Sequence, residues 1–128
     1  MTKTIWTFAI GAFLLTAVSA GGQTPRTGAM MREKLAHAQK VLEALTTSNQ
    51  KLLQTESAAL ERITQSPRWD ELRMTELQGY TDAFLKAVHE LNAAAERRDI
   101  DAAAVQYAAM TTACVRCHRR LKDLRIAR

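Results

Sequence analysis

Apolar residues recur every three or four positions along most of the chain, a spacing that predicts amphipathic helices. The first two helices are expected over residues 29–47 and 48–65, the third over residues 75–97, and the fourth from Asp99 onward. No segment alternates apolar and polar residues with a period of two, so no β-structure is expected. Four amphipathic helices with mostly short connections predict an all-α fold, an antiparallel four-helix bundle.

Polar residues at the predicted helix starts are suited to capping. Ser48, Thr75 and Asp99 each precede an apolar stripe and can accept a hydrogen bond from a free backbone N–H of the first turn. Residues 66–74 are expected to form the longest irregular connection, and this connection contains Trp69.

The first and last predicted helices each carry an apolar stripe that we expect to face the bundle interior. The stripe of the first helix is Met31, Leu35, Ala38, Leu42 and Leu45. The stripe of the last helix is Ile100, Ala104, Tyr107, Thr111, Cys114, His118 and Leu121. Three aromatic side chains at helical spacing, Tyr80, Phe84 and Tyr107, would either wall a bound cofactor or simply fill the core.

The last stripe contains the run Cys114-Val115-Arg116-Cys117-His118, whose spacing is that of a c-type haem attachment site. In such a site each cysteine forms a thioether with a haem vinyl group, and the adjacent histidine binds the iron. A redox dithiol and a zinc site are the alternatives. Zinc would need further ligands, for which the chain offers only His37 and His89. One covalent haem c, held by Cys114, Cys117 and His118, is therefore the predicted cofactor.

Covalent haem attachment requires export, and the N-terminus has the features of a secretory signal peptide. Lys3 is followed by an apolar run and by Val18-Ser19-Ala20, small residues that a signal peptidase accepts. The alternative is a permanent membrane anchor, but the apolar run is shorter than the roughly 20 residues that a spanning helix needs. We expect residues 1–20 to be cleaved, residues 21–28 to be a flexible lead, residues 29–128 to form the cytochrome domain, and the mature protein to be periplasmic without a membrane span.

Basic residues are concentrated around the haem motif. The formal net charge is +5, and the last turns carry Arg116, Arg119, Arg120, Lys122, Arg125 and Arg128. Two interpretations stay open: cations favoured at a helix C-terminus, or a docking surface for an acidic redox partner protein. Nucleic acid is not an expected partner, because the few aromatic residues are not interleaved with the basic ones.

The order of these elements resembles the class II cytochromes c, the cytochrome c′ family. The resemblance rests on Asp99-Ile100-Asp101 opening the final helix, on Tyr107 at an aromatic position, and on the haem motif near the end of that helix. It implies a four-helix bundle around one haem. It also allows a homodimer through the first two helices, with Val41 and Ala44 beside the main stripe of the first.

The resemblance implies that function depends on the sixth iron ligand. Met31 matches the position at which low-spin members carry a methionine ligand, whereas packing alone is the other explanation for Met31. Met30 and His37 are weaker candidates on the same helix. Arg32 matches a region where the family often places an arginine, and it would pair with a haem propionate or else be a solvated charge.

The leading hypothesis is a periplasmic monohaem electron carrier whose iron is bound by His118 and Met31. It is not expected to be an enzyme, since no pair of general base and nucleophile is evident. One alternative is a five-coordinate cytochrome c′ that binds nitric oxide or carbon monoxide at an open distal site. The other is a thiol-disulfide protein without haem.

Overall fold

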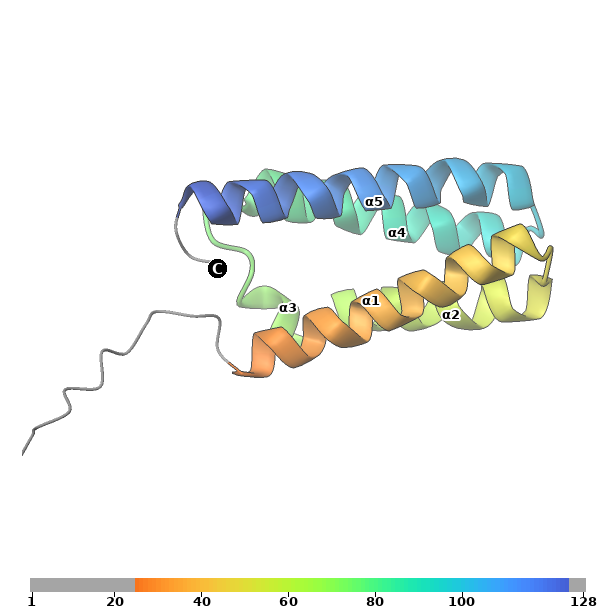
Figure 1. The fold of residues 1–128 in the computed structure, drawn as a ribbon, viewed down its shortest axis with the longest axis horizontal. Helices are drawn as coiled ribbons and strands as arrows, with labels where there is room; N and C mark the ends of the chain where they lie inside the picture. The colour runs from red at the N-terminus through yellow and green to blue at the C-terminus, as the bar shows by residue number, and fades with distance from the viewer. Residues whose placement is uncertain (1–24, 125–128) are drawn as a thin grey trace, which may run out of the picture.

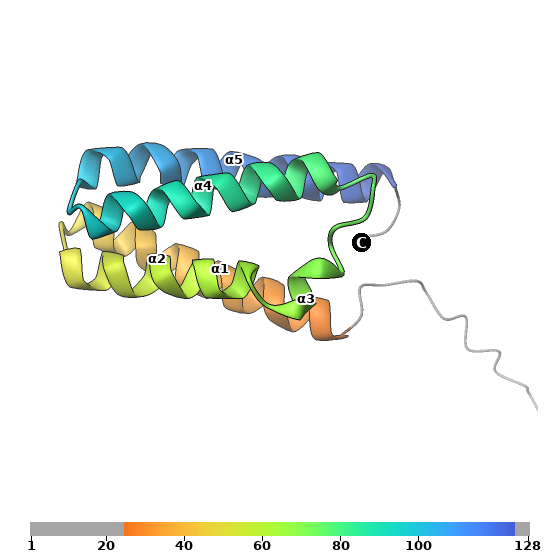
Figure 2. The same cartoon turned by 180° about the vertical axis from the view of Figure 1, so that it is seen from behind.

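The computed structural model describes residues 25–124, and this part of the chain contains five helices and no strand. The long helices α1 (Pro25–Thr46), α2 (Gln50–Thr64), α4 (Gln78–Glu96) and α5 (Ile100–Asp123) alternate in direction along the bundle (Figure 1). The short α3 (Pro67–Asp70) lies in the connection from α2 to α4, which is seen best from behind (Figure 2). The all-helical bundle predicted from the sequence is confirmed.

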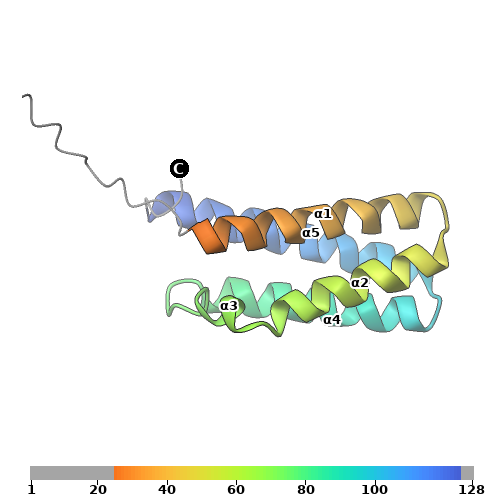
Figure 3. The ribbon, with the colours of Figure 1, turned by 90° about the horizontal axis from the view of Figure 1, so that it is seen from below.

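The four long helices form two layers, with α1 beside α2 and α4 beside α5 (Figure 1). Seen from below, α1 overlies α5 and α2 overlies α4 (Figure 3). The most extensive packing joins α4 to α5, α1 to α2 and α2 to α4, whereas α1 and α5 touch much less. The two helices diverge at the end where α1 begins and α5 ends (Figure 1). This divergence determines where the candidate site lies.

The helix boundaries differ from expectation at the N-terminus, and the α2–α4 connection, which was expected to be irregular, contains the short helix α3. Residues 25–28 were expected in a flexible lead, but α1 begins at Pro25. Proline suits the first helical position because its φ is already close to helical and it has no N–H to leave unpaired. The signal peptide predicted over residues 1–20, and residues 21–24, lie outside the described residues. No helix within residues 25–124 is both long enough and apolar enough to cross a membrane.

Of the three N-caps predicted from the sequence, one is observed and two are not. The Asp99 carboxylate accepts a hydrogen bond from the Ala102 N–H at 2.9 Å, as predicted. At α2 the cap is Asn49 rather than Ser48, which instead has a left-handed φ of 53° in the tight α1–α2 turn. Thr75 caps no helix, because α4 begins only after Leu77.

The buried faces of α1 and α5 are displaced by about one position from the predicted stripes. On α1, Met30, Val41 and Ala44 are fully buried, whereas Leu35 and Leu42 are 57% and 47% exposed. The buried residues of α5 are Ala103, Met110, Ala113 and Leu121, while Ala104, Thr111 and His118 are exposed. The reason is that both helices are apolar over a wide arc. One edge of the α1 arc packs against α2, and one edge of the α5 arc packs against α4. The other edge of each arc faces the gap between α1 and α5.

The position of the buried face of α1 also contradicts the expectation that Val41 and Ala44 could contact a second copy of the chain. Val41 and Ala44 were placed beside the main stripe, where they could contact a second copy. Both are fully buried within their own chain and belong to the core cluster. A dimer contact through these two side chains is therefore excluded.

Polar side chains connect the helices within the bundle. The His37 imidazole of α1 lies 2.5 Å from a Glu56 carboxylate oxygen on α2. The Asn92 amide of α4 donates to the Glu61 carboxylate of α2 at 2.6 Å. These pairs fix the relative register of α1, α2 and α4, because a shift of one turn would leave partly buried carboxylates without partners.

Substitution of two adjacent residues tests the register of α1. We expect Val41→Ala to lower the free energy of unfolding by about 2 kcal/mol, through lost burial and a residual cavity. Leu42→Ala should lower it by less than about 1 kcal/mol, although more atoms are removed, because the Leu42 side chain is half exposed. Urea denaturation followed by circular dichroism measures both. If Leu42→Ala were instead the more destabilising of the two, Leu42 would face the interior, as the stripe predicted from the sequence requires.

Candidate functional site

A cavity of about 400 Å³ lies where α1 and α5 diverge. Its lining residues are Met31, Arg32, Lys34, Leu35 and Ala38 from α1, Phe84 from α4, and Met110, Cys114 and His118 from α5. We call it the main cavity. Its volume lies within the usual range for sites that bind small molecules or cofactors.

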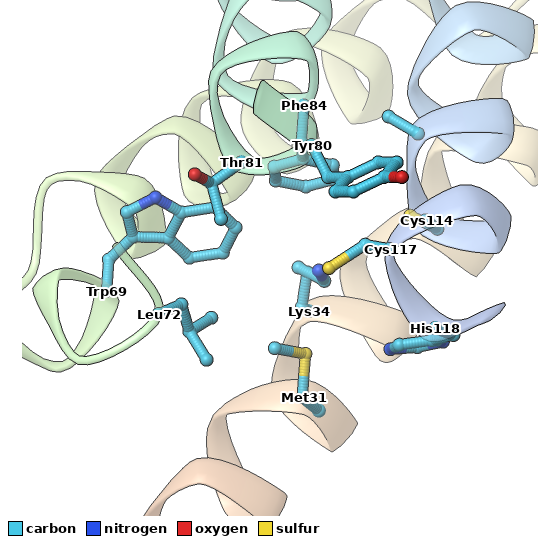
Figure 4. A pocket seen from close by; sticks show the side chains of 11 residues that line it. Met31, Lys34, Trp69, Leu72, Tyr80, Thr81, Phe84, Cys114, Cys117 and His118 are labelled. Atoms are coloured by element: carbon cyan, nitrogen blue, oxygen red, sulfur yellow. The ribbon is translucent and has the colours of Figure 1, made fainter. Parts of the chain in front are cut away.

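A small cleft of about 20 Å³ adjoins the main cavity and extends toward α3 and α4 (Figure 4). We call it the inner cleft. It shares Met31, Lys34, Phe84, Cys114 and His118 with the main cavity, and adds Trp69, Leu72, Tyr80, Thr81, Ala113 and Cys117. Cys114 and His118 therefore lie at the junction of the two spaces, and Cys117 lines the inner cleft.

The two cysteines are free thiols, and both are half-buried along the inner cleft. Burial raises the pKa of both thiols, and the nearby charge of Lys34 acts in the opposite direction. Both thiols are consequently neutral near pH 7. Residues three and four apart on a helix share a face, so Cys114 lies on the same side of α5 as Cys117 and His118.

His118 borders both spaces, and its side chain is exposed at their margin. Partial burial lowers the pKa of His118, and repulsion from Lys34 and Lys122 lowers it further. The neutral imidazole is thus favoured, which is the form of histidine that binds a metal ion.

Met31 lies across the cavity from the motif, as the antiparallel arrangement of α1 and α5 predicted. Its half-buried side chain lines both the main cavity and the inner cleft, and Figure 4 shows it projecting from α1 toward this space. Met30 is fully buried in the core instead. His37 lines neither space and is paired with Glu56, so it is not placed to face His118.

The other two residues predicted for the site differ in their placement. Arg32 lines the main cavity, and its side chain is exposed at the rim. Tyr107 lines neither space, because it packs from α5 against the core cluster. Phe84 and Tyr80, the other aromatic residues considered as walls, do line the inner cleft, and Trp69 joins them there.

Two residues that the sequence reasoning did not assign to the site, Lys34 and Trp69, form its inner wall. Trp69 is 2% exposed and stacks on Phe84, with ring centroids 5.1 Å apart. The Lys34 ammonium lies 4.1 Å from the centroid of Phe84 and 5.2 Å from that of Trp69. The spacing of Lys34 from Met30 and Val41 places it on the buried face of α1, but only the structure shows which face that is.

A basic surface lies next to the inner cleft on the outside of α5. Arg116, Arg119 and Arg120, together with Tyr80 and Asp123, line a shallow hollow there. Tyr80 also lines the inner cleft, so this side chain separates the two. Arg125 and Arg128, which the sequence adds to the basic cluster, lie outside the described residues.

Comparisons of the chain with the models of known protein families, with curated proteins and with solved structures gave no match. Within residues 25–124, no three histidine, cysteine, aspartate or glutamate side chains are grouped so that they could hold a metal ion by themselves. The resemblance to class II cytochromes c therefore stays a prediction from the sequence.

Proposed function

We propose that this protein is a periplasmic monohaem c-type cytochrome that carries single electrons. The observation that supports this best is that Met31, Cys114 and His118, which come from opposite ends of the described chain, border one cavity. When bound, haem c supplies one-electron cycling of its iron between the ferric and ferrous states. No catalytic role is proposed for the polypeptide.

The residues of the cavity fit a haem. Leu35, Ala38, Phe84 and Met110 offer apolar contacts to a flat macrocycle. Arg32 at the rim offers a guanidinium to a propionate, for which a charge-assisted hydrogen bond is well suited. The buried Nε1–H of Trp69 has no hydrogen-bond partner, which is unusual for an indole and fits a wall completed by another group.

In this proposal each functional residue has one role. Cys114 and Cys117 hold the haem covalently through thioethers. His118, in its neutral form, and Met31 would bind the iron. A methionine thioether opposite histidine raises the reduction potential and keeps external ligands away, which suits an electron carrier.

The proposed partner is an acidic redox protein that docks on the basic surface of α5. Arg116 and Arg119 are exposed there, close to the inner cleft that contains Cys117. Complementary charge would steer the encounter and increase its rate at low ionic strength. A short distance from this surface to the attached haem would favour electron transfer.

Covalent attachment is the direct test of the proposal. Protein exported by a host that attaches haem should keep its haem colour in a denaturing gel after acid-acetone extraction, because thioether bonds survive denaturation. The double variant Cys114→Ala with Cys117→Ala should lose the haem in the same gel. Complete extraction of haem from the unmodified protein, or no haem at all, would exclude a c-type cytochrome.

Replacement of the proposed proximal ligand should affect both the spectrum and the stability. We expect His118→Ala to change the iron spectrum and to lower the urea midpoint, since binding of the cofactor stabilises the folded state. The control is His89→Ala, whose side chain is exposed and lines neither the main cavity nor the inner cleft. A His118→Ala protein with unchanged spectrum and unchanged midpoint would refute the assignment.

The distal ligand is tested by Met31→Ala, with Met74→Ala in the α3–α4 connection as the matched control. The unmodified ferric protein should be low-spin with a weak far-red absorption band from sulfur bound to iron. Met31→Ala should abolish that band and increase the affinity of the ferrous protein for carbon monoxide by at least roughly tenfold. If the unmodified protein is already high-spin and binds carbon monoxide readily, Met31 only packs, and the gas-binding alternative is favoured.

A further inference from the structure

Lys34 is a buried cation without an anionic partner within residues 25–124. Lys34 is 9% exposed. Its Nζ lies 4.1 Å from the ring centroid of Phe84 and 5.2 Å from that of Trp69. Two acidic residues of the neighbouring helical surface, one on α1 and one on α2, are engaged elsewhere. Glu33 pairs with Arg68, and Glu56 pairs with His37 and Lys40.

Burial of an unpaired ammonium lowers the stability of the folded chain. An ammonium removed from water without a carboxylate loses much of its solvation free energy, and burial accordingly lowers the pKa of Lys34. The two aromatic faces return part of that energy through cation–π attraction. A methionine or leucine would fill the same space at lower cost, so the fold alone does not explain a lysine here.

The position of Lys34 relates it to the cavity rather than to the core. Lys34 follows Met31 by three residues, so both side chains lie on one face of α1. It borders both the main cavity and the inner cleft, together with Cys114 and His118 (Figure 4). A charge held in this water-poor wall interacts strongly with any charge that changes inside the cavity.

We propose that Lys34 is a positioned cation that raises the reduction potential of the haem, an inference that rests on the proposed function. Reduction adds one electron, delivered by the redox partner protein, and removes one positive charge from the iron without a proton transfer at Lys34. The ammonium repels the ferric state more than the ferrous state. It therefore favours electron uptake.

The test is an optical redox titration at pH 7 of the haem-loaded protein and three variants. Lys34→Met removes the charge and keeps a flexible side chain of similar length, whereas Lys34→Arg keeps the charge. Lys40→Met is the matched control, because it removes a lysine charge from the same helix where the side chain is 57% exposed.

We expect Lys34→Met to lower the ratio of ferrous to ferric protein at a fixed solution potential by roughly tenfold, which corresponds to ~59 mV for a one-electron couple. Lys34→Arg should stay within roughly threefold of the unmodified protein. Lys40→Met should change the ratio by less than about twofold, because water and salt screen its charge. The urea midpoint of Lys34→Met should equal or exceed that of the unmodified protein, which a merely structural lysine would not allow.

Three outcomes would overturn the inference. The first is a haem-loaded Lys34→Met protein with an unchanged potential. The second is an equal shift in Lys40→Met, which would indicate an effect of net charge alone. The third is loss of the unmodified protein's low-spin spectrum in Lys34→Met, which would make Lys34 an iron ligand or a support for one. Absence of haem in a pyridine haemochrome assay would instead refute the proposed function itself, whereas haem with an unshifted potential refutes only the role of Lys34.

Discussion

The divergence of α1 from α5 is the constraint on which the rest of the structure depends. Each helix has more apolar surface than the chain can cover, because α2 and α4 take only one edge of each apolar arc. The remaining edge, which includes Leu35 and Ala38 on α1, faces the main cavity. Apolar surface left in water costs roughly 25 cal/mol per Å². An apolar group bound in the cavity would therefore stabilise the bundle.

Rigid helices place the reactive side chains around that cavity. Asp99 fixes the start of α5, and extensive packing on α4 fixes its rotation, so the three motif residues near its end have defined directions. The pairing of His37 with Glu56 similarly fixes α1 against α2 and so orients Met31. A site built on helices keeps its geometry better than one built on loops, which suits a group that must change charge with little rearrangement.

Positive charge dominates this end of the bundle. Lys34 lies in the cavity wall, Arg32 at its rim, and Arg116 and Arg119 on the outer surface of α5. These cations lie at different depths, and depth determines what each can do. An exposed arginine acts over the distance of encounter with a partner and is weakened by salt, whereas a buried lysine acts over a few ångströms and is barely screened. In the proposed cytochrome, one sign of charge would thus serve both docking and control of the haem.

The sequence by itself determined the helical class, the order of the long helices, the Asp99 cap and the spacing of Cys114, Cys117 and His118, since all of these depend on neighbours along the chain. It also brought Met31 opposite His118, because alternating helix directions follow from short connections. Only the tertiary structure decided which edge of each apolar arc is buried, that Lys34 and Trp69 rather than Tyr107 line the site, and that Val41 and Ala44 belong to the core. The physical reason is that rotation of a helix about its axis is set by the side chains packed against it, and those come from distant parts of the chain.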